Sequence, residues 1–166
     1  MKVIFLDIDG VLLPLWTEWR WWRSEWRLTI PQSCAEALYK IADHTDSMIV
    51  ISSSWRHHME SCKDLLDQIA DFKYQVWWKD YVERIWDRVI SRTPSKTDGG
   101  RSTEILMWID EYHRSCKTGH HITHWIAIDD EWFDMKAIKR IGKLIKTDPN
   151  IWLTDEDAEL VISLLS

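Results

Sequence analysis

Residues 3–10 read VIFLDIDG, and this stretch decides the fold that we expect for the chain. The apolar run at residues 3–6 is rich in branched side chains and predicts a short buried β-strand, and Asp-Ile-Asp-Gly after it predicts a turn. Two later stretches have the same form. A strand predicted at 47–51 contains MIVI and is followed by three serines, and a strand predicted at 124–128 contains WIAI and is followed by two aspartates.

Helical patterns separate these strands. We predict helices at 31–42, 57–69 and 102–112, and a last helix that Thr154 caps. Residues 143–147 form a candidate short strand. Residues 72–78 are a candidate third strand and 81–89 a candidate short helix, while 12–29, 91–100 and 117–121 are predicted to be irregular. The alternation predicts an α/β fold, a three-layer α/β/α sandwich around a mainly parallel sheet, in a single domain spanning 1–166.

The composition restricts the functional classes. The chain has 166 residues and a formal net charge of −6, which argues against binding nucleic acid by bulk charge but leaves room for a local basic patch. Three widely spaced cysteines do not resemble a disulfide framework. The chain shows neither a secretory signal nor an apolar run long enough to cross a membrane. We therefore expect a cytoplasmic protein with no membrane partner.

Polar residues follow three of the predicted strands, where a parallel α/β sheet places its ligands. They are Asp7 and Asp9, the serines 52–54, and Asp129 with Asp130. Clustered carboxylates suit Mg²⁺, a hard cation that prefers oxygen ligands. One carboxylate can attack phosphorus and a second can transfer protons, while a hydroxyl and a cation hold the phosphoryl oxygens.

These stretches resemble the motifs of the haloacid-dehalogenase (HAD) superfamily. FLDIDGVL is similar to its first motif, IVISSSW to its second and AIDDEW to its fourth. More narrowly, SSSWR, GRSTEILMWIDEY, WIAIDD and TDPNIWLTDEDA together resemble the HAD domain of Swiss Army Knife RNA repair proteins. Trp152 departs from that pattern, because it stands where the tail motif is expected to have Gly. The resemblance implies a Rossmann-like fold and a Mg²⁺-dependent phosphatase that forms an aspartyl-phosphate.

The resemblance also implies a role for each acidic residue. Asp7 is the expected nucleophile and a metal ligand, and Asp9 the general acid and base, with a backbone carbonyl that binds the metal. Asp129 is expected to bind Mg²⁺ directly or through water, with support from Asp130.

For two of the expected site residues, the sequence leaves two candidates each. The hydroxyl of the second motif is Ser52 if the strand end sets the register and Ser53 if Trp55 does, and we favour Ser52. The cation of the third motif is Arg101 at the start of a predicted helix, or Lys96 in the loop before it.

The segments between the motifs bear on substrate size. Both gaps, residues 10–47 and 55–101, are too short for a folded cap domain beyond the sheet's own crossovers, so we expect a minimal cap or none. By resemblance, an open site favours large substrates, and we expect terminal phosphates of nucleotides or polynucleotides. Five tryptophans and three arginines between Trp16 and Arg27 could stack on bases, or could pack as an apolar flap. The alternatives are a small-metabolite or phosphoprotein phosphatase, and a catalytically silent binding module that uses this Trp-rich face.

Overall fold

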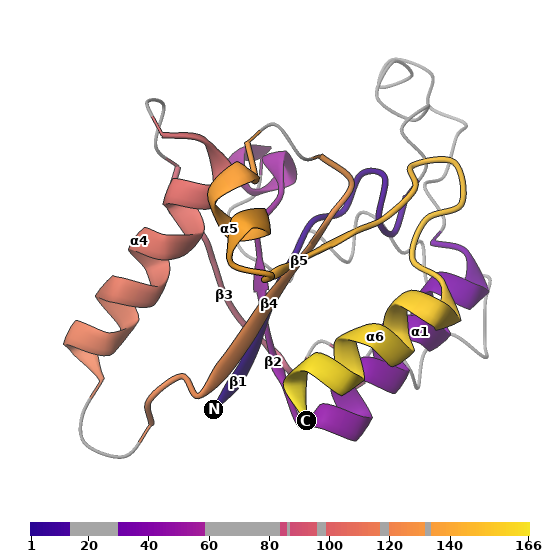
Figure 1. Cartoon of the computed structure of the whole chain (residues 1–166), viewed down its shortest axis with the longest axis horizontal. Helices are drawn as coiled ribbons and strands as arrows, with labels where there is room; N and C mark the ends of the chain where they lie inside the picture. The colour runs from indigo at the N-terminus through magenta and orange to yellow at the C-terminus, as the bar shows by residue number, and fades with distance from the viewer. Residues whose placement is uncertain (14–29, 59–83, 86, 96–98, 117–119, 132–133) are drawn as a thin grey trace.

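The structure is a computed structural model, and it describes residues 1–13, 30–58, 84–85, 87–95, 99–116, 120–131 and 134–166. Within these residues the chain forms one five-stranded sheet, in which all neighbouring strands are parallel and the order is β3-β2-β1-β4-β5 (Figure 1). The strands are β1 (Lys2–Leu6), β2 (Met48–Ile51), β3 (Val89–Arg92), β4 (His124–Asp129) and β5 (Leu144–Lys146).

The central strand shows why this sheet needs helices on both faces. Ile4 and Leu6 belong to one apolar cluster, whereas Val3 and Phe5 belong to another, because successive side chains of a strand point to opposite faces. Helices α1 (Gln32–Thr45) and α6 (Asp155–Leu165) supply the first cluster, and α4 (Gly100–Ser115) and α5 (Lys136–Arg140) supply the second (Figure 1). The predicted α/β/α sandwich is confirmed.

Most helices lie where the sequence predicted them. Helix α1 begins one residue after Pro31 and runs three residues past the predicted end, and α4 contains the whole of the predicted helix at 102–112. Thr154 caps α6 as expected: its hydroxyl accepts a hydrogen bond from the Asp157 N–H, and the Asp157 carboxylate accepts one from the Thr154 N–H.

One prediction is wrong at the β3 edge of the sheet. The helix expected at 81–89 is present at residues 84–85, but Val89–Arg92, expected to be the helix end and part of an irregular stretch at 91–100, forms strand β3 beside β2. An edge strand buries less apolar surface than a central one, and the sequence VISR therefore lacks the apolar run that marks the central strands. The other candidate third strand, 72–78, lies outside the described residues. The short helix α5 was not predicted, since five residues are too few to show a helical period.

Several expectations fall on residues that the structure does not describe. They concern the tryptophans between 16 and 26, the loop residue Lys96 and the greater part of the helix predicted at 57–69. Of that helix only residues 57–58 are described, and they end the short 3₁₀ helix η2 (Ser54–His58). The absence of a cap stays a prediction for the same reason, because 14–29 and 59–83 are the segments that would hold one. Among the described helices, none is long and apolar enough to span a bilayer.

The strand register brings the three sequence motifs to one edge of the sheet. Leu6, the last residue of β1, lies opposite Ile51 of β2 and Ile128 of β4. The residues that follow these positions, Asp7, Ser52 and Asp129, therefore leave the sheet side by side at its carboxyl edge.

Candidate active site

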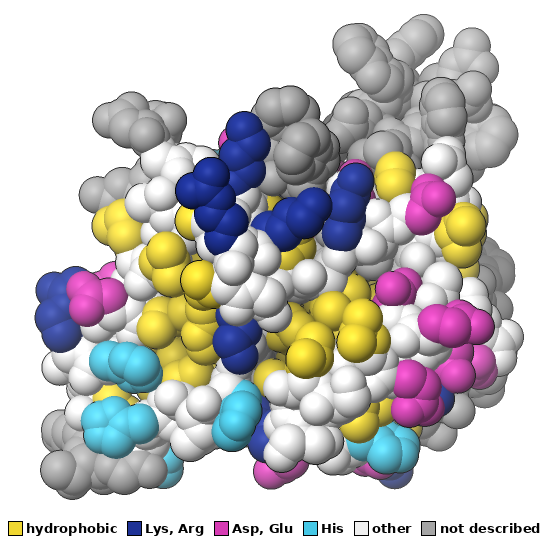
Figure 2. All heavy atoms as spheres, in the orientation of Figure 1, with side chains coloured by type: hydrophobic (Ala, Val, Ile, Leu, Met, Phe, Trp, Pro, Cys, Tyr) yellow, Lys and Arg dark blue, Asp and Glu magenta, His cyan; other side chains and the backbone are white. Residues whose placement is uncertain are grey.

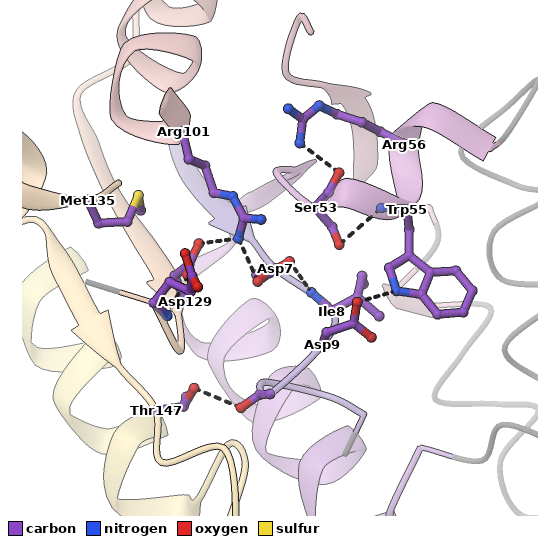
Figure 3. Close-up of polar contacts among 12 residues, drawn as sticks. Asp7, Ile8, Asp9, Ser53, Trp55, Arg56, Arg101, Asp129, Met135 and Thr147 are labelled. Atoms are coloured by element: carbon purple, nitrogen blue, oxygen red, sulfur yellow. Dashed lines mark hydrogen bonds and ion pairs between the residues drawn. The ribbon is translucent and has the colours of Figure 1, made fainter. Parts of the chain in front are cut away.

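Asp7 lies at the centre of this edge and is almost fully buried. The backbone N–H of Asp7 donates to the carbonyl of Ile128 at 3.0 Å, which extends the pairing of β1 with β4 by one residue. One carboxylate oxygen, Oδ1, accepts from the Ile8 N–H at 2.8 Å, and the other, Oδ2, accepts from Nη1 of Arg101 at 2.6 Å (Figure 3). Both oxygens are thus held in place by donors.

Arg101 joins two of the motifs. Its Nη1 also donates to Oδ2 of Asp129 at 2.7 Å, so one nitrogen bridges the carboxylates at the ends of β1 and β4. Burial alone would lower the pKa of this guanidinium, but the charges of Asp7 and Asp129 raise it overall. Of the two cations that the sequence left open, the structure brings Arg101 to the acids, and Lys96 lies outside the described residues.

The start of α4 fixes the position of Arg101. The backbone N–H and the hydroxyl of Ser102 both donate to the carbonyl of Asp134, at 3.1 and 2.5 Å. This contact ties the first turn of α4 to the segment that follows β4. The start of α4, which carries Arg101, is therefore held close to the acidic residues at the end of β4.

Asp7, Asp129 and Asp130 form a compact acidic group. One carboxylate oxygen from each lies within 4.8 Å of the others. Burial and the charge of Asp7 raise the pKa of Asp129 to about 7, although Arg101 opposes the shift, and the same two causes raise the pKa of Asp130 to about 6. Oδ1 of Asp129 accepts from the Glu131 N–H at 2.8 Å, which orients its carboxylate.

This acidic group fits a magnesium ion. All three donors are carboxylate oxygens, and Mg²⁺ is bound in proteins by one or two carboxylates together with water and substrate oxygens. Burial first, and then the charge of Asp7, disfavour the ionised forms of Asp129 and Asp130, so a bound cation would offset both costs. The Asp9 side chain is not part of this group of three.

Asp9 turns its side chain toward η2 instead. The indole Nε1–H of Trp55 donates to Oδ2 of Asp9 at 2.7 Å, and both residues are buried (Figure 3). The sequence did not single out Trp55 for this contact, although Trp55 stands next to the serines in the quoted SSSWR stretch.

The two candidate serines differ in their surroundings. Ser53 Oγ accepts a long hydrogen bond of 3.5 Å from the Trp55 N–H. Ser52 directly follows β2, its side chain is buried, and its hydroxyl has no hydrogen-bond partner among the residues that the structure describes. A buried hydroxyl without a partner is costly, so the Ser52 hydroxyl has a donor available for a bound ligand.

A buried ion pair braces η2 against α4. Nη2 of Arg56 contacts Oε2 of Glu104, and Nη1 of Arg56 donates to the carbonyl of Ser53 at 2.7 Å. Glu104 lies one turn beyond Arg101 on α4. The serine motif and the helix that carries Arg101 are thereby connected. Sequence reasoning missed this pair, because nothing in the spacing marks residues 48 positions apart as partners.

Gly10 allows the turn behind the acids to pass close to Asp130. Its φ is +69°, a conformation that side chains rarely adopt, and a Cβ there would overlap with Cγ and Oδ2 of Asp130. The Gly10 carbonyl accepts a hydrogen bond of 2.9 Å from the hydroxyl of Thr147, the residue after β5. This bond links the turn to the end of β5.

Comparisons with known proteins agree with this arrangement. The sequence model of a family described as the HAD domain in Swiss Army Knife RNA repair proteins matches residues 3–158. A search of curated proteins gives no match. The family match covers nearly the whole chain and includes the described strands except Lys2, the acidic group and Arg101. The chain therefore belongs to the family of HAD domains found in Swiss Army Knife RNA repair proteins.

Proposed function

We propose that this HAD domain is a magnesium-dependent phosphomonoesterase that works through an aspartyl-phosphate on Asp7. The observation that carries the proposal is the position of Arg101, whose Nη1 lies 2.6 Å from Asp7 and 2.7 Å from Asp129. A buried nucleophile with a cation beside it, at the carboxyl edge of a parallel sheet, has the arrangement that phosphoryl transfer requires.

In the proposed reaction, Asp7 attacks the phosphorus atom and the bond to the leaving oxygen breaks. Asp9 gives its proton to that oxygen, and then takes a proton from the water that hydrolyses the aspartyl-phosphate. Arg101 and the Ser52 hydroxyl donate to the phosphoryl oxygens and stabilise the charge that develops there. When bound, Mg²⁺ would be held by Asp7, Asp129 and Asp130 and would neutralise charge on the phosphoryl group.

We propose the terminal phosphate of a nucleotide or polynucleotide as the substrate. The description of the matched family, which places these domains in RNA repair proteins, favours this class. A small-metabolite or phosphoprotein phosphatase is the alternative enzyme. The silent binding module has less support, because the described site retains the acidic group, the basic residue beside it and a hydroxyl with no protein partner.

A panel of substrates tests the choice. Release of phosphate would be measured, at equal concentrations with Mg²⁺, from 3′- and 5′-phosphorylated oligonucleotides, mononucleotides, a sugar phosphate and a phosphopeptide. We expect the largest kcat/KM for an oligonucleotide or nucleotide. A larger value for the sugar phosphate or the phosphopeptide would contradict the substrate proposal and leave the chemistry standing.

A further inference from the structure

Positive charge is concentrated in one short segment of this acidic protein. Residues 136–146 read KAIKRIGKLIK, with five basic side chains and no acidic one, in a chain whose formal net charge is −6. The five are Lys136, Lys139, Arg140, Lys143 and Lys146, which we call the α5–β5 basic surface. Figure 2 shows Lys and Arg side chains gathered over α5 and β5, while Asp and Glu side chains gather over α6 on the same face.

The α5–β5 basic surface borders the candidate active site on two sides. Lys146 lies opposite Asp129 in the pairing of β4 with β5, so their Cα atoms are about 5 Å apart. At the other end, Lys136 follows Asp134 by two residues, and the carbonyl of Asp134 holds the start of the helix that carries Arg101. A ligand chain leaving the acidic group toward α5 would therefore pass along these side chains.

Three cations of this surface, Arg140, Lys143 and Lys146, are available to a ligand. Lys136, Lys139, Arg140 and Lys146 are exposed, and Lys143 is half-buried with its Nζ 5.9 Å from the centre of the Trp125 ring. No carboxylate among the described residues forms an ion pair with Arg140, Lys143 or Lys146. By contrast, Lys40 on α1 is paired with Asp155 and Glu159, and Arg114 on α4 with Asp110.

We infer that the α5–β5 basic surface binds the phosphate backbone of a single-stranded nucleic acid whose end enters the active site. This inference rests on the proposed function, because the strand is oriented by its terminal phosphate, which would lie at Asp7. A row of cations that continues a site for one phosphate fits a ligand that carries further phosphates at regular intervals. A phosphopeptide or a sugar phosphate does not carry a series of regularly spaced phosphates. An anionic lipid surface could use the cations but would not present a strand end to the buried Asp7.

The test measures binding separately from hydrolysis. A labelled single-stranded oligonucleotide with hydroxyls at both ends, prepared as RNA and as DNA, is titrated with the full-length protein over a range of salt concentrations. The variant is Arg140→Gln with Lys143→Gln. The matched control is Lys40→Gln with Arg114→Gln. It also removes two positive charges, but from basic residues that already have carboxylate partners.

We expect the wild-type protein and the control to bind alike, and the Arg140/Lys143 variant to bind about tenfold more weakly. The slope of log K against log[salt] should also become shallower by about 1.4 in the variant, since each lost contact with a single strand removes about 0.7. Equal binding by the variant and the control would overturn the inference. So would wild-type protein that binds phosphatidylserine vesicles but not the oligonucleotide at low salt.

Hydrolysis keeps the two proposals distinguishable. If the inference holds, the Arg140/Lys143 variant should keep wild-type kcat/KM on para-nitrophenyl phosphate and lose about tenfold in kcat/KM on a phosphorylated oligonucleotide. Protein that binds the oligonucleotide through these residues but hydrolyses no phosphate ester would contradict the proposed function while supporting the surface.

Discussion

The indole Nε1–H of Trp55 donates a hydrogen bond of 2.7 Å to Oδ2 of Asp9 (Figure 3). Trp55 belongs to η2 and ends the IVISSSW stretch, and Asp9 lies within the FLDIDGVL stretch, so this bond joins the first and second motifs through residues 46 positions apart. A general acid must be held in line with the leaving oxygen, and a buried donor on one carboxylate oxygen restricts how the group can rotate. Trp55 thus holds the group to which we assign proton transfer.

Trp55→Phe should lower kcat about tenfold with little change in KM, because it removes the N–H and keeps most of the ring. The loss should be larger for an alkyl phosphate than for para-nitrophenyl phosphate, since a poor leaving group depends more on the acid. Trp108→Phe is the control: Trp108 is 8% exposed against 7% for Trp55, and its Nε1–H donates to Ser91 Oγ at 3.1 Å. Equal losses in the two variants would mean that Trp55 serves stability alone.

Gly10→Ala should weaken magnesium binding. The added Cβ would overlap with the Asp130 carboxyl group, so Asp130 must move away from Asp7 and Asp129. Gly142→Ala is the matched control, because Gly142 has nearly the same φ, +67°, but no atom within 4 Å of its Cβ position. Both variants should lose about 1 kcal/mol of stability from the left-handed backbone. Only Gly10→Ala should need several-fold more Mg²⁺ for half-maximal activity, and an equal Mg²⁺ requirement in both variants would refute the reasoning.

Glu104→Gln should lower the free energy of unfolding by about 2 kcal/mol or more. Arg56 and Glu104 are both buried, and removal of one charge leaves the other uncompensated in the interior. Arg114→Gln breaks an exposed pair with Asp110 and should change stability by less than about 0.5 kcal/mol. Urea unfolding of the two variants measures both values. A loss for Glu104→Gln no larger than that for Arg114→Gln would show that the brace between η2 and α4 contributes little.

The sequence predicted the parts of the site that lie at strand ends. Apolar runs such as residues 3–6 identify buried central strands, and the residues after them must meet at one edge of a parallel sheet. The contacts that position those residues were not predictable, because Trp55 with Asp9 and Arg56 with Glu104 are pairings across the fold with no local signal. Strand β3 was missed because an edge strand needs no apolar run.

Trp152 adopts a backbone conformation that usually requires glycine. The sequence resemblance led us to expect Gly at this position, and the backbone there has φ +65°, the left-handed conformation that Gly adopts most easily. The Trp152 N–H donates to the Asp148 carbonyl at 2.7 Å, and the ring packs against the apolar cluster on the α1 and α6 face. A non-glycine residue therefore occupies this left-handed turn with its ring packed on the apolar cluster.

Without metal, stability should fall as pH rises from about 4 to about 7. The folded pKa values of Asp129 and Asp130, about 7 and about 6, lie above the value near 3.8 of an unperturbed aspartate. The folded state therefore binds more protons than the unfolded state in this window, and each carboxylate that ionises there weakens folding. Thermal unfolding in EDTA at pH 5 and at pH 8 measures the effect.

Magnesium should reverse this trend. The ion competes with protons for the same carboxylates, so it should raise Tm more at pH 8 than at pH 5. A shift in Tm that is the same at both pH values would indicate that Mg²⁺ binds away from Asp129 and Asp130.

The central claim is that Asp7 is the nucleophile of a magnesium-dependent phosphatase. The most direct measurement is hydrolysis of para-nitrophenyl phosphate by the wild-type protein with Mg²⁺ and with EDTA, beside Asp7→Asn. We predict release that requires Mg²⁺ and falls by about 10³-fold or more in Asp7→Asn, with the fold intact by circular dichroism. Release that persists in the folded Asp7→Asn variant, or that is equal in EDTA, would contradict the account.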